Sequence, residues 1–345
     1  MLMKVATPAA ILACAASSLT LPAVAQSSQA TSSVSLYGLV DLYAGSLRRS
    51  NEAARTTAVS SGGMNTTFWG VAGTEDLGGG LRTQFALESF FQADTGTNGR
   101  NTTDPYFSKN AWVGFASGDW GVARLGRQTN PLFLATGASN PFGTSLALSP
   151  LMLHTWQPTY NRAVLGDSVW DKAAYYGSPE YAGLRVGIQH TFAGTEPNKR
   201  NTNVTVNYTR AALSAVVSAQ RAEAGPGFTT AVDLQRVVMA GISYDFGPVK
   251  GFASLQRART PDIATTANTA QLGALAPMGQ GRLLASVVRT RRDVDTGADS
   301  TRVTAGLGYE YFLSKRTDLY AVALRDRLTS FSSQNSFAAG MRHRF

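Results

Sequence analysis

Cysteine is almost absent from this 345-residue chain. The one cysteine, Cys14, lies in an apolar segment within the first 25 residues. The remainder of the chain therefore has no side chain that could form a disulfide bond, a thiolate nucleophile or a cysteine-bound metal site.

Histidine is also scarce, with three residues at positions 154, 190 and 343. Their spacing matches no metal-binding motif, and none has a partner spacing typical of a catalytic triad. We therefore expect no cofactor, no metal site and no enzymatic activity. A membrane-bound hydrolase, which needs a nucleophile with a base in reach, is the alternative from another class.

No apolar run reaches the length of a membrane-spanning helix. The longest extends from about Val5 to Leu21, follows Lys4 and precedes the small-x-small site Ala23-Val24-Ala25. This pattern predicts a secretory signal peptide over residues 1–25 and an exported domain over residues 26–345. A lipoprotein signal cleaved before Cys14 is the alternative, but it would cut the apolar core short.

The net charge of +9 is scattered along the chain. Proteins that bind nucleic acid usually gather their basic residues into a patch or stripe. We therefore expect no nucleic-acid partner for this exported chain.

What the sequence does contain is a repeated segment of roughly ten residues with alternating polarity. Residues 302–311, 204–209 and 337–342 each alternate apolar side chains with polar or small ones. A period of two predicts β-strands with one face toward lipid or a core and one face toward water. About sixteen such segments are present.

The connections between these segments alternate in length. Short turns lie at residues 76–80, 118–121, 245–248 and 314–316, and long loops lie at about 47–64, 93–105, 130–167, 223–233 and 328–335. This alternation predicts an all-β fold, a transmembrane antiparallel up-and-down β-barrel with two different ends. The terminal Phe345 closes an amphipathic strand, which is typical of barrels sorted to the outer membrane of Gram-negative bacteria.

Several stretches, in the correct order over the whole exported length, resemble the Gram-negative general porin family of the beta-proteobacterial type. They are Ser33–Gly38, Gly73–Leu81, Phe85–Ser89, Phe107–Gly114, Leu125–Gln128, Ser314–Tyr320 and Gly340–Phe345. The resemblance implies a sixteen-stranded barrel, usually a homotrimer, whose third external loop folds into the lumen. It also implies passive diffusion of small hydrophilic solutes and ions, with outer-membrane lipid and lipopolysaccharide as neighbours.

In that family, basic side chains on the wall face acidic ones on the third loop. Here the third loop spans about Thr129 to Asp167, and residues 128–166 contain no Asp or Glu. Arg127 and Arg162 match basic constriction positions, whereas Leu39 and Phe68 stand where a basic residue is usual. The resemblance therefore predicts a less charged, more hydrophobic constriction than the family norm.

Alternation adds Arg82 and Glu88 to the expected pore-lining residues, with Arg82 near a periplasmic turn. Lys109 lies at the external end of its strand and is a further candidate. Alternation turns Arg124 inward and Arg127 outward, so a pore role for Arg127 requires a bulge or a strand end. For each basic residue, a solvated or lipopolysaccharide-facing position is the alternative.

Two basic residues without an opposing carboxylate predict a weak preference for anions. The apolar side chains of the loop, from Leu146 to Trp156, could pack against the wall or form a partly apolar constriction. The second arrangement would suit a substrate-specific channel, which is the alternative function. An adhesin or a barrel without a pore would not need a long loop at this position.

Overall fold

The computed structural model describes residues 32–192 and 199–345. The predicted signal peptide, residues 1–25, lies outside the described residues and stays a prediction. In the part of the chain that is described, no helix combines the length and the apolar character needed to cross a membrane.

The alternating segments form antiparallel strands, each paired with its neighbour in the chain. In the described residues the strands are β1 (Ser33–Leu47), β2 (Thr56–Ser61), β3 (Phe68–Gly78), β4 (Leu81–Phe90), β5 (Asn110–Ser117), β6 (Gly121–Thr129), β7 (Val169–Gly177), β8 (Leu184–Thr191), β9 (Thr202–Arg210), β10 (Leu213–Ala222), β11 (Gln235–Asp245), β12 (Lys250–Thr260), β13 (Thr265–Met278), β14 (Gly281–Val294), β15 (Ser300–Phe312), β16 (Thr317–Leu328) and β17 (Gln334–Arg344). The helices are α1 (Pro131–Ala138), α2 (Pro150–Trp156), and the 3-10 turns η1 (Pro158–Tyr160) and η2 (Pro261–Ile263).

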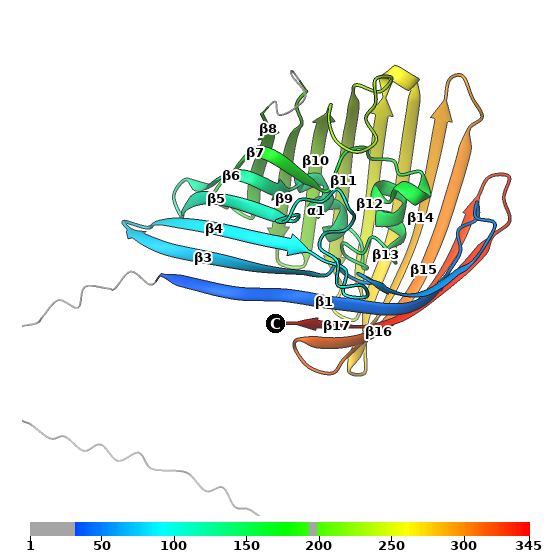
Figure 1. The fold of residues 1–345 in the computed structure, drawn as a ribbon, viewed down its shortest axis with the longest axis horizontal. Helices are drawn as coiled ribbons and strands as arrows, with labels where there is room; N and C mark the ends of the chain where they lie inside the picture. Colours follow the sequence, from blue (N-terminus) through cyan, green and yellow to red (C-terminus); the bar gives the residue numbers. More distant parts are fainter. Residues whose placement is uncertain (1–31, 193–198) are drawn as a thin grey trace, which may run out of the picture.

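The sheet closes on itself because the first and last strands pair (Figure 1). The β1–β17 register runs from Leu39 opposite Arg344 to Ser46 opposite Phe337. Strands β2 and β3 both pair with β1, one with its second half and one with its first. They are two parts of one barrel strand, so the closed barrel has sixteen strands and the predicted fold class is confirmed.

A short insertion, residues 62–67, separates β2 from β3 and is held by one side chain on β1. The Asp41 carboxylate accepts hydrogen bonds from the backbone N–H groups of Gly63, Met64 and Asn65, at 3.1, 2.9 and 2.7 Å. The Tyr320 hydroxyl on β16 also donates to Asp41. This carboxylate therefore satisfies the donors that the broken ladder leaves free.

The two faces of each strand differ as the alternation predicts. On β11, Val237 and Met239 point into the barrel and are buried, whereas Val238 and Ile242 point outward and are exposed. Exposed apolar side chains continue around the outside on neighbouring strands, at Val217, Leu255, Leu272, Val287 and Leu307. An outward apolar band of this kind is the lipid-facing surface of a membrane barrel.

Two predicted loops contain regular structure. Residues 47–64 include β2, because Thr56–Ser61 extends the β1 ladder outward. Residues 130–167 include α1 and α2, each with Pro in its first turn and a capping side chain, from Asn130 and Ser149 respectively. These local helix-start signals are short and carry no long periodic pattern.

The segment from residue 130 to residue 168, here called the inner loop, lies inside the ring of strands (Figure 1). Its side chains pack against the inward faces of the strands in two apolar clusters. One cluster includes Phe142, Leu148 and Leu153 against β14, β16 and β17, and the other includes Leu132, Met152 and Trp156 against β10 to β13. The inner loop therefore fills the lumen on the β10–β17 side.

Candidate functional site: the channel cavity

The space left beside the inner loop is a cavity of about 630 Å³, here called the channel cavity. Strands β1 and β3 to β9 supply one side of it, and the inner loop supplies the other. Four charged side chains line it: Glu88, Arg100, Lys109 and Arg124. How each of the four is paired decides the electrostatic character of the cavity.

The negative charge of Glu88 on β4 is offset by a neighbouring lysine. Its carboxylate accepts hydrogen bonds from the Lys109 ammonium group at 2.7 Å and from the Tyr37 hydroxyl at 2.8 Å, and also from Asn110. Lys109 in turn lies 3.5 Å from the centroid of the Phe68 ring. This cluster contributes one negative and one positive charge to the cavity, and the two offset each other.

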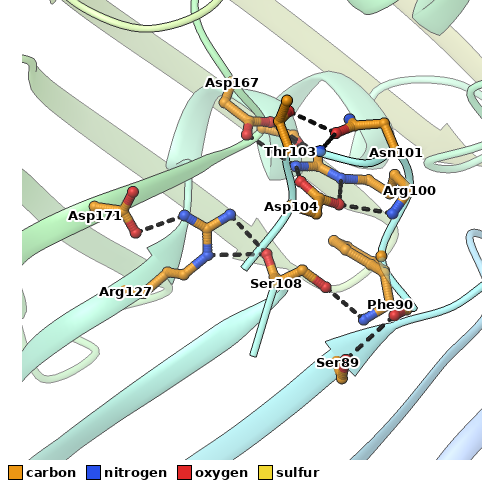
Figure 2. Close-up of polar contacts among 12 residues, drawn as sticks. Ser89, Phe90, Arg100, Asn101, Thr103, Asp104, Ser108, Arg127, Asp167 and Asp171 are labelled. Atoms are coloured by element: carbon orange, nitrogen blue, oxygen red, sulfur yellow. Dashed lines mark hydrogen bonds and ion pairs between the residues drawn. The ribbon is translucent and has the colours of Figure 1, made fainter. Parts of the chain in front are cut away.

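Arg100 is also fully paired, outside the strands. Figure 2 shows its guanidinium between Asp104 and Asp167, at 2.7 to 2.9 Å from their oxygens. Burial alone would raise the pKa of Asp167, but the hydrogen bonds and charge of Arg100 outweigh it and hold that pKa below its ordinary value. The group connects the 92–108 loop to the end of the inner loop.

Arg124 on β6 is different because the described residues offer its guanidinium no hydrogen-bond acceptor and no carboxylate. Its central carbon lies 4.2 Å from the Trp112 ring centroid and 5.9 Å from that of Tyr175. Its Nε atom is buried and unpartnered among the described residues. Arg124 therefore brings an uncompensated positive charge to the channel cavity.

Two further predicted pore residues, Leu39 and Phe68, lie in the cavity lining with the charged side chains described above. Leu39 is buried on the inward face of β1, and Phe68 lies at the start of β3. Tyr37 and Phe68 meet edge to face, with centroids 6.1 Å apart. The wall at this point is aromatic and aliphatic, with Lys109 and Glu88 beside it.

Arg127 does not line the channel cavity. A register shift between Gly126 and Gln128 on β6, with φ of 132° at Gly126, places Gln128 in the cavity lining. Arg127 instead donates to the Ser108 carbonyl and to the exposed Asp171, as Figure 2 shows. The bulge that its pore role required is present, but it leaves Arg127 beside a carboxylate away from the cavity.

Arg162 and Arg82 also lie outside the cavity lining. Arg162 donates to the carbonyls of Trp156, in the inner loop, and of Pro226, in the loop between β10 and β11. Burial lowers the pKa of Arg162, and the charge of Asp167 partly offsets this. Arg82 is exposed near the β3–β4 turn, opposite Asp76, on the same face of β4 as Glu88.

The inner loop presents an apolar surface to the cavity. Pro131, Phe133, Leu134 and Ala138 of α1 line it together with Leu146, and Leu134 is 51% exposed. Leu132, on the opposite face of α1, packs against the wall. Most apolar side chains of the loop therefore hold it in place, while a smaller set shapes the opening.

Arg124 is the cavity charge that the family pattern did not indicate. The inward direction of its side chain followed from alternation along β6, but nothing in the sequence revealed that its neighbours are aromatic rings and not carboxylates. Arg127 matched a family position, yet its own surroundings pair it with Asp171. Comparing the strand parity of both arginines would have favoured Arg124.

Comparison with known proteins gives consistent results. The family model described as Gram-negative porin matches residues 10–329. An outer membrane porin protein of Bordetella pertussis is 28% identical, over 93% of this chain and 96% of that one. Outer membrane porin protein 32 of Delftia acidovorans is 30% identical, over 86% of this chain and 85% of that one.

Solved structures agree in fold. The anion-selective porin from Comamonas acidovorans has a TM-score of 0.76 and 25% identity, and the alignment covers 91% of this chain and 100% of that one. The trimer form of OmpT from Vibrio cholerae has a TM-score of 0.70 and 16% identity, with 91% and 99% covered. The second likeness supports the fold alone.

Proposed function

This chain belongs to the Gram-negative porin family, and from that premise we propose that its channel weakly prefers anions. It is a non-enzymatic channel protein of the outer membrane. The observation that carries the proposed preference is Arg124, the one charge of the cavity lining that the described residues leave without a counter-ion. Fixed charge beside a narrow passage sets the barrier for ions of each sign.

The size of the effect follows from Coulomb's law. A unit charge roughly 10 Å from a permeating ion, in a water-like medium, changes its energy by about 0.4 kcal/mol. That energy changes the permeability of each ion roughly twofold, in opposite directions for anions and cations, so the anion-to-cation ratio changes roughly fourfold and the preference is weak. The solutes are small hydrophilic molecules and ions that diffuse down their gradients.

The test is the reversal potential of the purified protein in a planar lipid bilayer under a potassium chloride gradient. We expect the wild type to favour chloride and Arg124→Gln to reduce the anion-to-cation permeability ratio roughly fourfold. Arg289→Gln removes an equal charge from the outer surface and should leave the ratio unchanged. Cation selectivity of the wild type would overturn the proposal.

A homotrimer is part of the same proposal. Its support is family membership, together with the trimer form of Vibrio cholerae OmpT among proteins of this fold. Sedimentation of the protein in detergent, compared with the mass of the heat-denatured chain, tests it.

Lipopolysaccharide is the proposed lipid partner. Exposed arginines point outward near the external ends of the strands, above the apolar band, and include Arg236, Arg257, Arg259, Arg289 and Arg325. Cationic side chains at this level match the phosphate groups of a phosphorylated outer leaflet.

A second candidate function, a substrate-specific channel, is favoured by the apolar surface of the inner loop in the cavity. Purely general channels gain nothing from exposed apolar side chains in the passage, whereas binding sites for small molecules are usually lined by them.

A further inference from the structure

The part of the channel cavity around Arg124 combines a guanidinium group with aromatic and apolar side chains. Arginine stacked on an aromatic ring uses the face of its guanidinium plane and leaves the edge N–H groups free. Trp112 takes one face at 4.2 Å, and Tyr175 lies nearby. The described residues place no acceptor for the Nη1 and Nη2 N–H groups of Arg124, so these donors are left to molecules in the lumen, whereas its Nε atom is buried and unpartnered.

Small residues in the wall make room for this arrangement. A Cβ atom at Gly114 on β5 would lie 2.8 Å from Cγ of Arg124. A Cβ atom at Gly187 on β8 would lie 2.9 Å from the Tyr175 hydroxyl oxygen. Arg124 and Tyr175 therefore lie flat against the wall at positions where larger neighbours would push them into the passage.

The surface on the other side of the cavity is apolar. Phe133, Leu134, Ala138 and Leu146 belong to the inner loop, and residues 128–166 contain no acidic side chain. Arg124 and this apolar surface line the same cavity, so both face a molecule that occupies it. The cavity, at about 630 Å³, lies within the range of roughly 300–1,000 Å³ that is usual for small-molecule sites.

We propose that Arg124, Trp112 and the apolar face of α1 form a binding site for small aromatic monocarboxylates of the benzoate type. The carboxylate accepts two charge-assisted hydrogen bonds from the guanidinium edge. The ring packs against the aromatic and aliphatic side chains that face it. This inference rests on the proposed channel function and specifies the solute class that the cavity favours.

Other solute classes fit less well. A second carboxylate, as in succinate, would be desolvated against Phe133 and Leu134 without a paired cation. The hydroxyl groups of a sugar would lose their hydrogen bonds to water against the same side chains. An uncharged aromatic molecule such as benzyl alcohol would leave Arg124 unpaired.

Binding is measured without relying on conduction, by saturation-transfer difference NMR of the folded protein in detergent. The probes are benzoate, succinate and benzyl alcohol, at one ionic strength. We expect benzoate to bind at least tenfold more tightly than either of the others. Equal binding of all three would overturn the site.

Three variants locate the binding. Arg124→Gln should weaken benzoate binding at least tenfold, and Arg124→Lys should give an intermediate loss because it keeps the charge and loses the planar fork. Arg289→Gln, a surface control, should bind as the wild type does. Benzoate affinity that is the same in Arg124→Gln and Arg289→Gln would overturn the inference. If the glutamine variant does not fold, Arg124→Lys takes its place in that comparison.

Bilayer recording separates this inference from the proposed function. Open-channel chloride current that benzoate reduces in the wild type, and not in Arg124→Gln, supports both. Open channels in a protein that binds no benzoate would leave the porin function standing and overturn the site. Benzoate binding by a protein that never conducts would keep the site and overturn the proposed channel preference.

Discussion

The protonation state of a buried polar residue in this barrel depends on its immediate neighbours, and His154 is an example. It lies on α2, fully buried, with both ring nitrogens 2.8 Å from threonine hydroxyls, Thr290 and Thr304. Thr304 also donates to Asp326, so it accepts from His154 Nε2–H, and Thr290 donates to Nδ1. This network fits a neutral imidazole.

Acid should therefore destabilise the fold through His154. Burial, reinforced by the charge of Arg302, lowers the pKa of His154 to about 3. Between about pH 6.5 and pH 3, this histidine is protonated in the unfolded chain and neutral in the folded chain. The free energy of unfolding therefore falls by about 1.4 kcal/mol for each pH unit in that range.

The test measures the free energy of unfolding by urea, in lipid vesicles at pH 7, 5.5 and 4. It compares the wild type with His154→Gln, whose glutamine does not titrate. The stability difference between wild type and variant should shrink as the pH falls. A difference that stays constant with pH would contradict the neutral, buried imidazole.

At the scale of single elements, one carboxylate stabilises the interruption between β2 and β3. Asp41 accepts three backbone N–H groups and the Tyr320 hydroxyl, and it is completely buried. Removing a buried acceptor leaves each donor unsatisfied, which usually costs about 1–3 kcal/mol per group.

We expect Asp41→Ala to lower the free energy of unfolding by roughly 3 kcal/mol or more. Asp76→Ala is the matched control, because Asp76 accepts one N–H group, from Gly78, in an exposed turn. That control should cost at most about 1 kcal/mol. Urea unfolding of both variants in the same vesicles gives the comparison, and equal losses would contradict the role of Asp41.

For the whole molecule, the outer surface divides into an apolar band and a rim of outward arginines. Arg257, Arg259 and Arg289 are exposed on β12 and β14, near the external ends of these strands. A basic residue near an anionic membrane surface contributes about 1 kcal/mol to binding. We therefore expect this arrangement to favour one orientation of the barrel in an asymmetric membrane.

Replacing Arg257, Arg259 and Arg289 together by Gln should therefore weaken binding to purified lipopolysaccharide by roughly a hundredfold. Surface plasmon resonance on lipopolysaccharide-containing bilayers measures it. The control replaces Arg82, Lys315 and Arg316 by Gln, which removes the same charge at the periplasmic end. Equal losses of affinity in both triple variants would mean that binding depends on the net charge of the protein and not on the arginines of the external rim.

Much of this architecture follows from the sequence alone. The period of two fixes which side chains face lipid and which face the lumen, because successive residues of a strand point to opposite sides. The alternation of short and long connections fixes the up-and-down order and the two ends. Leu39 and Phe68 could thus be assigned to the inner wall from parity and resemblance.

What only the tertiary structure decided is how the charges pair. Arg127 and Arg124 lie three positions apart, yet a bulge at Gly126 leaves one beside Asp171 and the other between aromatic rings. Arg162 is bound by carbonyls of its own loop and of the 223–234 loop. Such pairings join residues distant in the chain, and local periodicity carries no information about them, because an electrostatic interaction depends on separation in space.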